Sequence, residues 1–165
     1  MDKILVAYFS ATGTTARVAQ ALAEAGGCDL YAITPAVPYS AADLNWHDKQ
    51  SRTSLEMADA ASRPAIAGAL PDVAPYGTIF VGFPIWWYQA PRIIETFVQA
   101  LDFSGKTLIP FATSGGSPLG DSGAILEKLC PGSRWLPGRR LNAGVTAGAL
   151  RDWLAELGLA PEGGR

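Results

Sequence analysis

The sequence predicts an α/β protein folded as a single doubly wound domain, and three observations support this prediction. Short apolar runs alternate along the chain with stretches of helical periodicity, as expected for parallel strands joined by crossover helices. Residues 79–81 and 108–111 are apolar at nearly every position, which is typical of strands covered on both faces. The chain of 165 residues is long enough to bury one core. We therefore expect one domain over residues 1–160, a parallel sheet with helices on both faces, and a flexible tail at residues 161–165.

Five segments are predicted to be strands. Each is short, rich in apolar residues and bounded by turn signals or by a helical stretch. The fifth is weaker than the others, because Pro137-Gly138 interrupts the chain directly after it. The predicted strands are residues 3–9, 29–33, 78–83, 107–113 and 133–136.

Four segments show helical periodicity after these strands. In the second of them, Pro91 fits the first helical position, and Ile93, Phe97 and Leu101 recur every four residues on one face. In the last of them, apolar residues around Trp153 recur in the same way. The predicted helices are residues 14–25, 90–101, 120–129 and 147–157.

Residues 35–75 do not fit this simple alternation. They separate the second and third predicted strands by about forty residues, whereas a crossover connection needs far fewer. Asp48 or Ser51 could begin a short helix that continues through Met57. We therefore treat residues 35–75 as an insertion between these two strands.

Composition argues against several classes of function. With 13 Lys and Arg against 15 Asp and Glu, the net charge of −2 gives no broad electrostatic footprint for nucleic acid or anionic lipid. No apolar stretch approaches the roughly 18 residues that a membrane-spanning helix needs, and the N-terminus lacks a signal-peptide pattern. Cys28 and Cys130 lie far apart and outside any Cys-x-x-Cys pattern. We interpret them as buried thiols and expect a cytoplasmic protein with no nucleic-acid or membrane partner.

The first candidate binding loop follows the first strand and precedes the first helix. A helix N-terminus leaves backbone N–H groups without partners and carries the positive end of the helix dipole. The loop lacks both the Gly-x-x-x-x-Gly-Lys and the Gly-x-Gly-x-x-Gly patterns, which disfavours triphosphate hydrolysis and dinucleotide binding. It predicts a cradle for a bound monophosphate, and the alternative is an ordinary helix start capped by Ser or Thr. Its residues are Ser10, Ala11, Thr12, Gly13, Thr14 and Thr15.

The second candidate loop follows the third strand and contains three adjacent aromatic residues. Consecutive strand residues point to opposite faces, so a core can take only some of these rings. We expect at least one ring to stack on a flat aromatic ligand, which is worth about 0.5–1.5 kcal/mol beyond area burial. The alternative for one tryptophan is packing under the loop as part of the core. The loop residues are Pro84, Ile85, Trp86, Trp87 and Tyr88.

The third candidate loop follows the fourth strand and contains paired glycines. Glycines let the backbone approach a planar ring closely and direct N–H groups at its heteroatoms. The alternative is a plain turn followed by a helix cap at Ser117 or Asp121. The candidate binding residues are Thr113, Ser114, Gly115, Gly116 and Ser117.

All three loops leave the carboxyl edge of the predicted sheet, where doubly wound proteins bind their ligands. A phosphate cradle, an aromatic platform and a glycine-rich backbone edge together indicate a site for flavin mononucleotide (FMN). Spacing reveals no Ser/His/Asp triad, paired carboxylates or metal cluster, so we predict no catalytic or metal-ligating residue. This is expected in a flavin protein, because the cofactor carries the redox chemistry.

The three loops also resemble those of the flavodoxin family. Ser-x-Thr-Gly-Thr-Thr at residues 10–15 is similar to the family's phosphate signature. Pro-Ile-Trp-Trp and Thr-Ser-Gly-Gly-Ser resemble the two ring-binding loops of its bacterial flavodoxin-like branch. The resemblance covers most of the chain. It implies a five-stranded parallel sheet in the order 2-1-3-4-5, FMN as the cofactor, and electron transfer to a redox partner protein or a small-molecule acceptor.

Two departures from the family leave alternatives open. The chain is nearly neutral, whereas flavodoxins that carry electrons are typically strongly acidic, and its extra length lies between the second and third strands. An alternative function is therefore an FMN-dependent NAD(P)H reductase of a quinone, azo or nitro compound. A third is a domain without catalytic activity whose loop is vestigial or binds another phosphorylated ligand.

Residues 44–52 of the insertion provide a further hypothesis. This segment contains Trp46 beside His47, the only histidine of the chain. We hypothesise that it folds over the flavin and shapes a small-molecule pocket, although a lone histidine on a loop is usually just solvated. Arg52 and Glu56 are spaced to pair across one helical turn.

Overall fold

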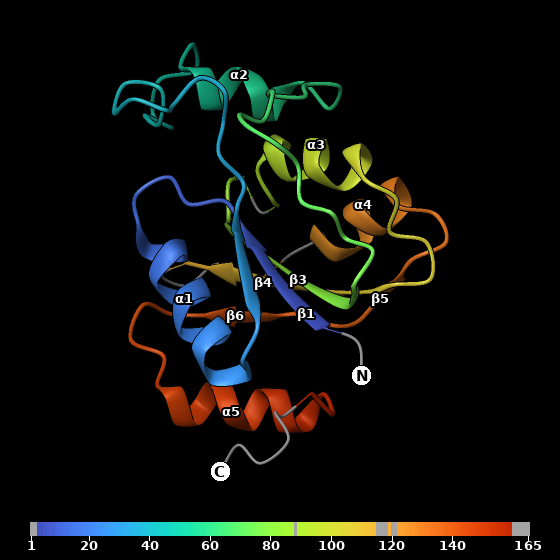
Figure 1. The fold of residues 1–165 in the computed structure, drawn as a ribbon. Helices are drawn as coiled ribbons and strands as arrows, with labels where there is room; N and C mark the ends of the chain where they lie inside the picture. Colours follow the sequence, from blue (N-terminus) through green and yellow to red (C-terminus); the bar gives the residue numbers. More distant parts are fainter. Residues whose placement is uncertain (1–2, 88, 115–118, 120–121, 160–165) are drawn as a thin grey trace.

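The computed structural model describes residues 3–87, 89–114, 119 and 122–159, and it contains a parallel sheet between two layers of helices (Figure 1). The predicted residues Tyr88, Gly115, Gly116 and Ser117 and the predicted tail lie outside the described part. In chain order the elements are β1 (Lys3–Tyr8), α1 (Thr14–Gly26), β2 (Asp29–Ala32), α2 (Arg52–Ala58), β3 (Tyr76–Pro84), α3 (Arg92–Ala100), β4 (Thr107–Thr113), α4 (Ser122–Leu129), β5 (Arg134–Trp135), β6 (Arg139–Leu141) and α5 (Ala147–Glu156).

The sheet has the predicted order β2-β1-β3-β4-β5, and every pair of neighbouring strands is parallel. In the central register Val6 lies beside Phe80, and Phe80 lies beside Ile109. These three side chains are completely buried because helices cover both faces of the sheet. The carboxyl ends of β1, β3 and β4 therefore meet at one edge.

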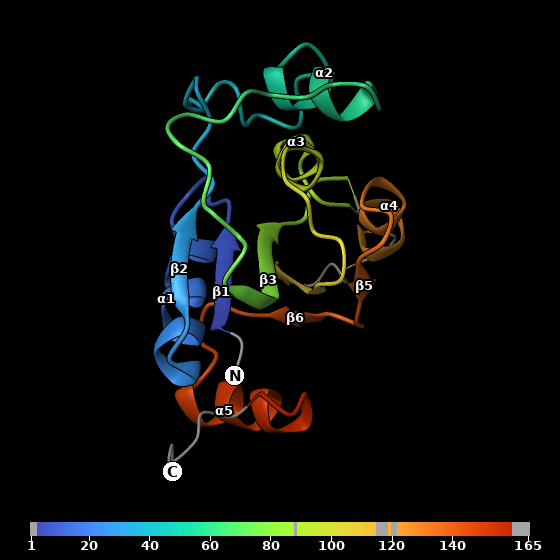
Figure 2. The ribbon, with the colours of Figure 1, turned by 45° about the vertical axis from the view of Figure 1, so that its right-hand side comes forward.

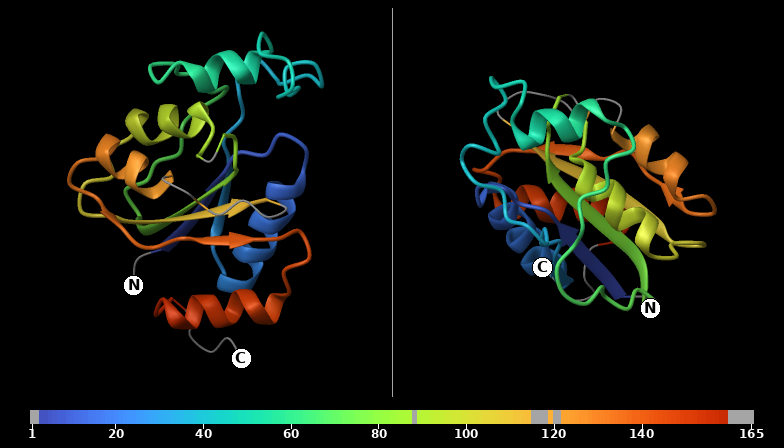
Figure 3. Two further views of the ribbon diagram at one scale, coloured as in Figure 1. Left: turned by 180° about the vertical axis from the view of Figure 1, so that it is seen from behind. Right: turned by 90° about the horizontal axis from the view of Figure 1, so that it is seen from above.

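The fifth position of the sheet differs from the prediction. The expected strand at residues 133–136 is observed as β5, which pairs with the start of β4, and an unpredicted strand β6 pairs with the end of β4. Figure 3 shows β6 running beside β4. Pro137 lacks an N–H and Gly138 lies so close to β4 that an added Cβ would be 2.0 Å from the Pro110 carbonyl oxygen. The fifth strand is thus divided into two short pieces at this close approach.

The two faces of the sheet carry two separate apolar clusters. Leu5 and Ala7 point toward the cluster that contains Phe97 of α3, whereas Val6 points toward the cluster that contains Leu22 of α1 and Trp153 of α5. This alternation follows from the two-residue period of a strand. Figure 2 shows α1 and α5 on the opposite side of the sheet from α3 and α4, which confirms the predicted layers.

Described helix boundaries lie within one residue of the predictions except at the start of α3. The predicted start of the helix at residues 120–129 lies outside the described part. Pro91 is the N-cap of α3, with a ψ of 151°, and Arg92 is the first helical residue. The predicted helix start at Ala90, with Pro91 inside the helix, was therefore wrong, because Pro91 has extended backbone geometry. In α2, the Ser51 side chain accepts a hydrogen bond from the Ser54 N–H, so Ser51 begins this helix.

Helix α2 does not cover a face of the sheet. It lies beyond the carboxyl ends of the strands, above α3 (Figures 1 and 2). The side chain of Arg92 in α3 holds it there by donating to the carbonyl oxygens of Glu56, at 3.2 Å, and Met57, at 2.8 Å. The buried carboxylate of Glu95 neutralises Arg92 at 2.9 Å. The insertion is therefore anchored to the same edge of the sheet as the candidate loops.

Both cysteines are free thiols, and Cys130 is buried as predicted. The prediction of a buried thiol was wrong for Cys28, which is only partly buried because it comes directly before β2, the edge strand of the sheet. Burial raises the pKa of each thiol to about 11.

No helix in the described part of the chain is long and apolar enough to cross a membrane. Among the described residues, no group of three His, Cys, Asp or Glu side chains could hold a metal ion.

Candidate functional site

A cavity of about 450 Å³ lies at the carboxyl edge of the sheet, within the range of ordinary small-molecule sites of roughly 300–1,000 Å³. It brings together residues of all three predicted loops, one residue of the insertion and two residues that follow β6. None of the described residues that line the cavity is acidic or basic. The lining residues are Ala11, Thr12, Thr14, Thr15, Leu44, Pro84, Trp86, Thr113, Ser114, Asn142 and Ala143.

The first loop delivers an uncapped helix start to this cavity. The N-cap of α1 is Gly13, with a φ of 97°, and the helix has no side-chain cap and no acidic residue in its first turn. By contrast, Ser51 caps α2 and Thr146 caps α5 through their side chains. The alternative of an ordinary Ser- or Thr-capped helix start therefore does not describe α1. Its first-turn N–H groups and its dipole are available to an anion.

The hydroxyl groups of the first loop divide into two sets. The hydroxyl groups of Thr12, Thr14 and Thr15 belong to residues that line the cavity, whereas Ser10 does not line it. Gly13, which has no side chain, does not line it either. The Ser10 hydroxyl instead accepts a hydrogen bond from the Gly13 N–H at 3.0 Å, which closes the turn before α1. The sequence signature thus separates into residues that shape the loop and residues that face the ligand space.

Of the described residues of the second loop, Trp86 is the one whose aromatic ring lines the cavity wall. Trp86 packs edge-on against Phe9, with ring centres 5.6 Å apart, and against Tyr39, with ring centres 5.4 Å apart. Trp86 and Gln89 also exchange two backbone hydrogen bonds, which close a tight turn in which Trp87 has a φ of 50°. Trp87 is 42% exposed and does not line the cavity. Trp86 therefore lies between the aromatic core and the cavity.

The remaining predicted residues are placed as follows. Ile85 packs against the buried cluster below the loop and does not line the cavity. Thr113 and Ser114 of the third loop line the cavity. Thr113 contacts the first loop directly, because the hydroxyl oxygens of Thr15 and Thr113 are 2.7 Å apart.

Two cavity residues were not predicted from the sequence. Asn142 and Ala143 follow β6, so they reach the carboxyl edge only because β6 pairs with β4. A predicted strand after Pro137-Gly138 would have indicated these two residues. However, β6 has only three residues, which are too few to show the alternation of apolar and polar positions that identifies a strand. Leu44 belongs to the insertion and was expected near the site only as part of the segment 44–52.

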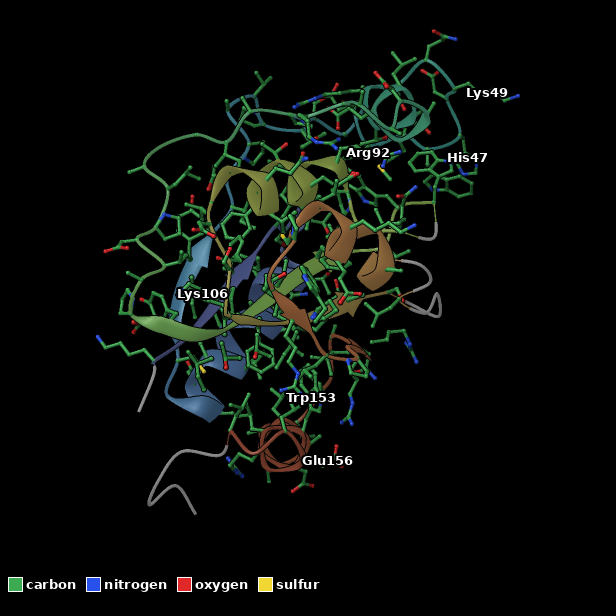
Figure 4. The ribbon with its side chains drawn as sticks, turned by 90° about the vertical axis from the view of Figure 1, so that its right-hand side faces the viewer. His47, Lys49, Arg92, Lys106, Trp153 and Glu156 are labelled. Carbon is green, nitrogen blue, oxygen red and sulfur yellow. The ribbon has the colours of Figure 1, made fainter. Side chains whose placement is uncertain are left out.

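That segment meets the cavity at Leu44 but not at its aromatic residues. The Asp43 carbonyl oxygen accepts two hydrogen bonds from Thr53, from its N–H at 3.1 Å and its hydroxyl at 2.8 Å, which fix the turn before Leu44. Trp46 and His47 stack on each other with ring centres 3.7 Å apart, and Trp46 is 65% exposed. Figure 4 shows His47 and Lys49 at the outer end of the insertion. Only Leu44 supports the hypothesis that this segment shapes the pocket.

A cluster of polar side chains holds Tyr39, the ring against which Trp86 packs. The Tyr39 hydroxyl donates to Glu56 at 2.6 Å, and Arg52 donates to the other Glu56 oxygen at 2.9 Å, which confirms the expected pair of Arg52 and Glu56. The Arg52 guanidinium also lies 3.8 Å from the centre of the Tyr39 ring. Burial, together with the Glu56 carboxylate, raises the pKa of Tyr39 well above its usual value. Tyr39 therefore stays neutral and holds the ring against which Trp86 packs.

The basic pair of residues in β6 is held by local contacts. Arg139 pairs with Glu156 of α5 at 2.7 Å and lies over the Trp153 ring. Figure 4 labels this end of α5. Arg140 donates to the Ser114 carbonyl oxygen at 3.3 Å, which ties β6 to the third loop.

The residues around the cavity fit a flavin mononucleotide. Three threonine hydroxyls and an uncapped helix start suit a phosphate, the indole of Trp86 suits a flat ring, and none of the described lining residues carries a charge that would oppose an anion. Together with the doubly wound sheet, this defines a flavin-nucleotide-binding protein of the α/β class.

The chain belongs to the flavodoxin family, because the model of the family described as Flavodoxin matches residues 3–157. A protein from Bacteroides eggerthii DSM 20697, provisionally named a flavoprotein, is 51% identical over 96% of this chain and 99% of its own, with a TM-score of 0.90. One from Bacteroides uniformis ATCC 8492, named in the same way, is 53% identical over 93% of this chain and 98% of its own, with a TM-score of 0.89.

A more distant structure shares the fold. The flavoprotein of Lactobacillus acidophilus NCFM, solved in complex with FMN, is 18% identical over 85% of this chain and 93% of its own, with a TM-score of 0.68. No curated protein matches the sequence. Membership of the flavodoxin family and the cavity residues agree on FMN as the cofactor, as the sequence predicts.

Proposed function

We propose that this chain is an FMN-binding redox protein of the flavodoxin type, which passes electrons through a tightly bound FMN to a redox partner protein or a small-molecule acceptor. The observation that carries the proposal is the cavity at the carboxyl edge, which combines the uncapped start of α1 with the indole of Trp86. FMN supplies the redox chemistry when it is bound, and the residues of the chain bind and orient it.

The described residues of the cavity wall include no lysine or arginine to hold the phosphate. Thr12, Thr14 and Thr15 donate hydroxyl protons, and the first-turn N–H groups of α1 add further donors. Hydrogen bonds to an anion are about twice as strong as those between neutral groups. These donors therefore stabilise the phosphate although they carry no formal charge.

The rest of the wall is largely apolar. Leu44, Pro84, Trp86 and Ala143 exclude water from the space beside the ring, and Trp86 is held in place by Phe9. An environment with few polar groups disfavours added negative charge. These residues therefore influence how readily the bound flavin accepts electrons.

One observation favours a second candidate function, an FMN-dependent NAD(P)H reductase acting on a quinone or a similar small acceptor. Leu44 of the insertion forms part of the cavity wall, so the segment 44–52 adds a surface beside the flavin site. The near-neutral net charge of −2 is also consistent with a small-molecule partner. In both cases we infer a cytoplasmic location, which the two free thiols support.

Anaerobic mixing of the FMN-loaded protein with NADH or NADPH tests the proposal. For an electron carrier we expect slow bleaching of the flavin absorbance by either nucleotide, and uptake of electrons in resolved steps during stepwise chemical reduction. Fast bleaching that repeats when a quinone is added would overturn the carrier function and support the reductase.

A further inference from the structure

Two threonine side chains connect the first and third loops inside the cavity. The hydroxyl oxygens of Thr15 and Thr113 are 2.7 Å apart, although the residues are 98 positions apart in the chain. Thr15 is 2% exposed and Thr113 is 5% exposed, and both line the cavity. Thr15 lies in the first turn of α1, beside the uncapped N-terminus, whereas Thr113 is the last residue of β4.

The number of protons in this pair limits what it can do. Each hydroxyl has one proton to donate and can accept two hydrogen bonds, and the contact between the two oxygens uses one proton. If Thr15 donates to Thr113, then Thr15 presents only lone pairs to the cavity. If Thr113 donates to Thr15, the proton of Thr15 remains available to another acceptor.

A phosphate dianion selects the second arrangement. It has no proton to give, so it binds only where donors face it, and lone pairs on Thr15 would repel it. A hydroxyl that accepts a hydrogen bond also becomes a better donor, because a chain of hydrogen bonds polarises its members. Donation from Thr113 therefore both orients the Thr15 hydroxyl and strengthens it toward an anion.

We propose that Thr113 is a positioning residue for recognition of the cofactor's phosphate, which acts through Thr15 although it belongs to the loop expected to bind the flavin ring. The pair thereby contributes to the selection of a flavin with a terminal phosphate over one without it. The proposal rests on the FMN site of the proposed function and is independent of where the electrons go.

A comparison of FMN with riboflavin isolates this role, because riboflavin has the same ring and chain but no phosphate. Apo-protein is titrated with each flavin, and flavin fluorescence gives the two dissociation constants. The proteins compared are the parent, Thr113→Val, Thr15→Val and the variant with both changes. Thr113→Ser retains the hydroxyl and serves as the conservative control, and Thr113→Ala removes it by a second route.

We expect Thr113→Val to weaken FMN binding about 3- to 10-fold, the range of one hydrogen bond, while riboflavin binding stays within a factor of two. Thr15→Val should weaken FMN binding further, since it removes the donor itself. The variant with both changes should match Thr15→Val, because Thr113 has no effect on the phosphate without Thr15. Thr113→Ser should bind both flavins as the parent does, and Thr113→Ala should resemble Thr113→Val.

Two results would overturn the proposal. If Thr113→Val and Thr113→Ala weaken FMN and riboflavin binding by the same factor, Thr113 acts on the ring or the chain of the flavin. If the two valine substitutions multiply in their effect on the ratio of the dissociation constants, Thr113 acts independently of Thr15. A parent protein that binds neither flavin would overturn the proposed function as well. If the parent binds FMN but Thr113→Val leaves the ratio of the FMN and riboflavin dissociation constants unchanged, only this inference is overturned.

Discussion

Single hydroxyl groups give the cavity its polar character. Thr12, Thr14 and Thr15 place three hydroxyl groups on the cavity wall. They lie next to the start of α1, whose N-cap Gly13 provides no side-chain cap. Because hydroxyl groups and the helix dipole take the place of a charged side chain among the described cavity residues, removal of a single hydroxyl group should weaken anion binding strongly and affect folding little.

The first prediction concerns the phosphate cradle. Thr12→Val combined with Thr14→Val should weaken FMN binding by roughly 2–3 kcal/mol, since each lost hydrogen bond to an anion costs about 1.5 kcal/mol or more. Fluorescence titration of the apo-protein measures this change. The matched control is Thr146→Val, which removes the side-chain cap of α5 outside the cavity lining and should lower stability by about 1 kcal/mol with FMN affinity unchanged. Unchanged FMN affinity in the double variant would show that these hydroxyls do not bind the phosphate.

The second prediction concerns Gly82 in the middle of the sheet. A Cβ added there would lie 2.2 Å from the ring of Phe111, which is completely buried. Gly82→Ala should therefore lower the free energy of unfolding by about 2–3 kcal/mol, as expected for an overpacked core. Gly123→Ala is the control, since nothing lies within 4 Å of its added Cβ and alanine favours helix α4. Urea unfolding should show it to be at least as stable as the parent, and equal stability of the two variants would contradict the packing argument.

At the scale of elements, the insertion is held in place by one arginine of α3. Arg92 donates to the carbonyl oxygens of Glu56 and Met57 in the last turn of α2, and it pairs with the buried Glu95. This contact brings α2 and the preceding turn to the edge of the sheet, and with them Leu44 to the cavity.

The third prediction follows from this anchor. Arg92→Met should lower the free energy of unfolding by about 3–5 kcal/mol, because it leaves the carboxylate of Glu95 buried with only the more distant Arg63 to neutralise it. Adding Glu95→Gln to Arg92→Met should recover part of this loss, since the buried charge is then removed. Urea unfolding gives the stabilities, and hydrogen exchange should show faster exchange in α2 for both variants. Additive losses in the combined variant would contradict a buried ion pair.

The elements that the sequence predicts well have complete periodic patterns of their own. Helix α1 and strand β4 were placed within one residue, because their apolar residues and their flanking loops specify them locally. Strand β6 was not predicted, because it depends on the close approach of Gly138 to Pro110, a contact between distant segments. Leu44 was expected near the site as part of the segment 44–52, but its place in the cavity also depends on contacts between distant segments, those of Arg92 with α2.

At the scale of the whole molecule, the alternation of strands and helices was sufficient to predict the parallel sheet, its two helical layers and the edge at which the cavity lies. The strand order was predicted from the resemblance to the flavodoxin family. The residues that line the cavity were predicted in part. The three loops meet there, but Asn142 and Ala143 enter it through β6, and Trp87 points away from it. Which member of an aromatic pair faces the ligand depends on the packing of Trp86 against Phe9 and Tyr39, which no local pattern reveals.

The fourth prediction concerns stability at alkaline pH. Cys28 and Cys130 keep their protons in the folded protein up to a pKa of about 11, against an ordinary value of 9.0. Between these values the folded state binds more protons than the unfolded state, so a rise in pH favours unfolding. The contribution of the thiols to stability should be fully present below pH 9 and lost as the pH rises through 11.

Urea unfolding at several values between pH 8 and pH 11 measures this loss. The variant with Cys28→Ala and Cys130→Ala should lose stability less steeply over this range than the parent. Some loss should remain, because a hydrogen bond to Asp29 raises the pKa of Tyr76 to about 12. Equally steep curves for the parent and the variant would contradict the assignment of the thiols as protonated in the folded protein.

The central claim is that the cavity at the carboxyl edge of the sheet binds FMN through α1 and Trp86. Equilibrium titration of the purified apo-protein with FMN, followed by flavin fluorescence, tests it most directly. We predict saturable binding with quenching of the flavin by the indole of Trp86, and loss of much of that quenching in Trp86→Leu. The absence of saturable FMN binding by the parent protein would contradict the claim.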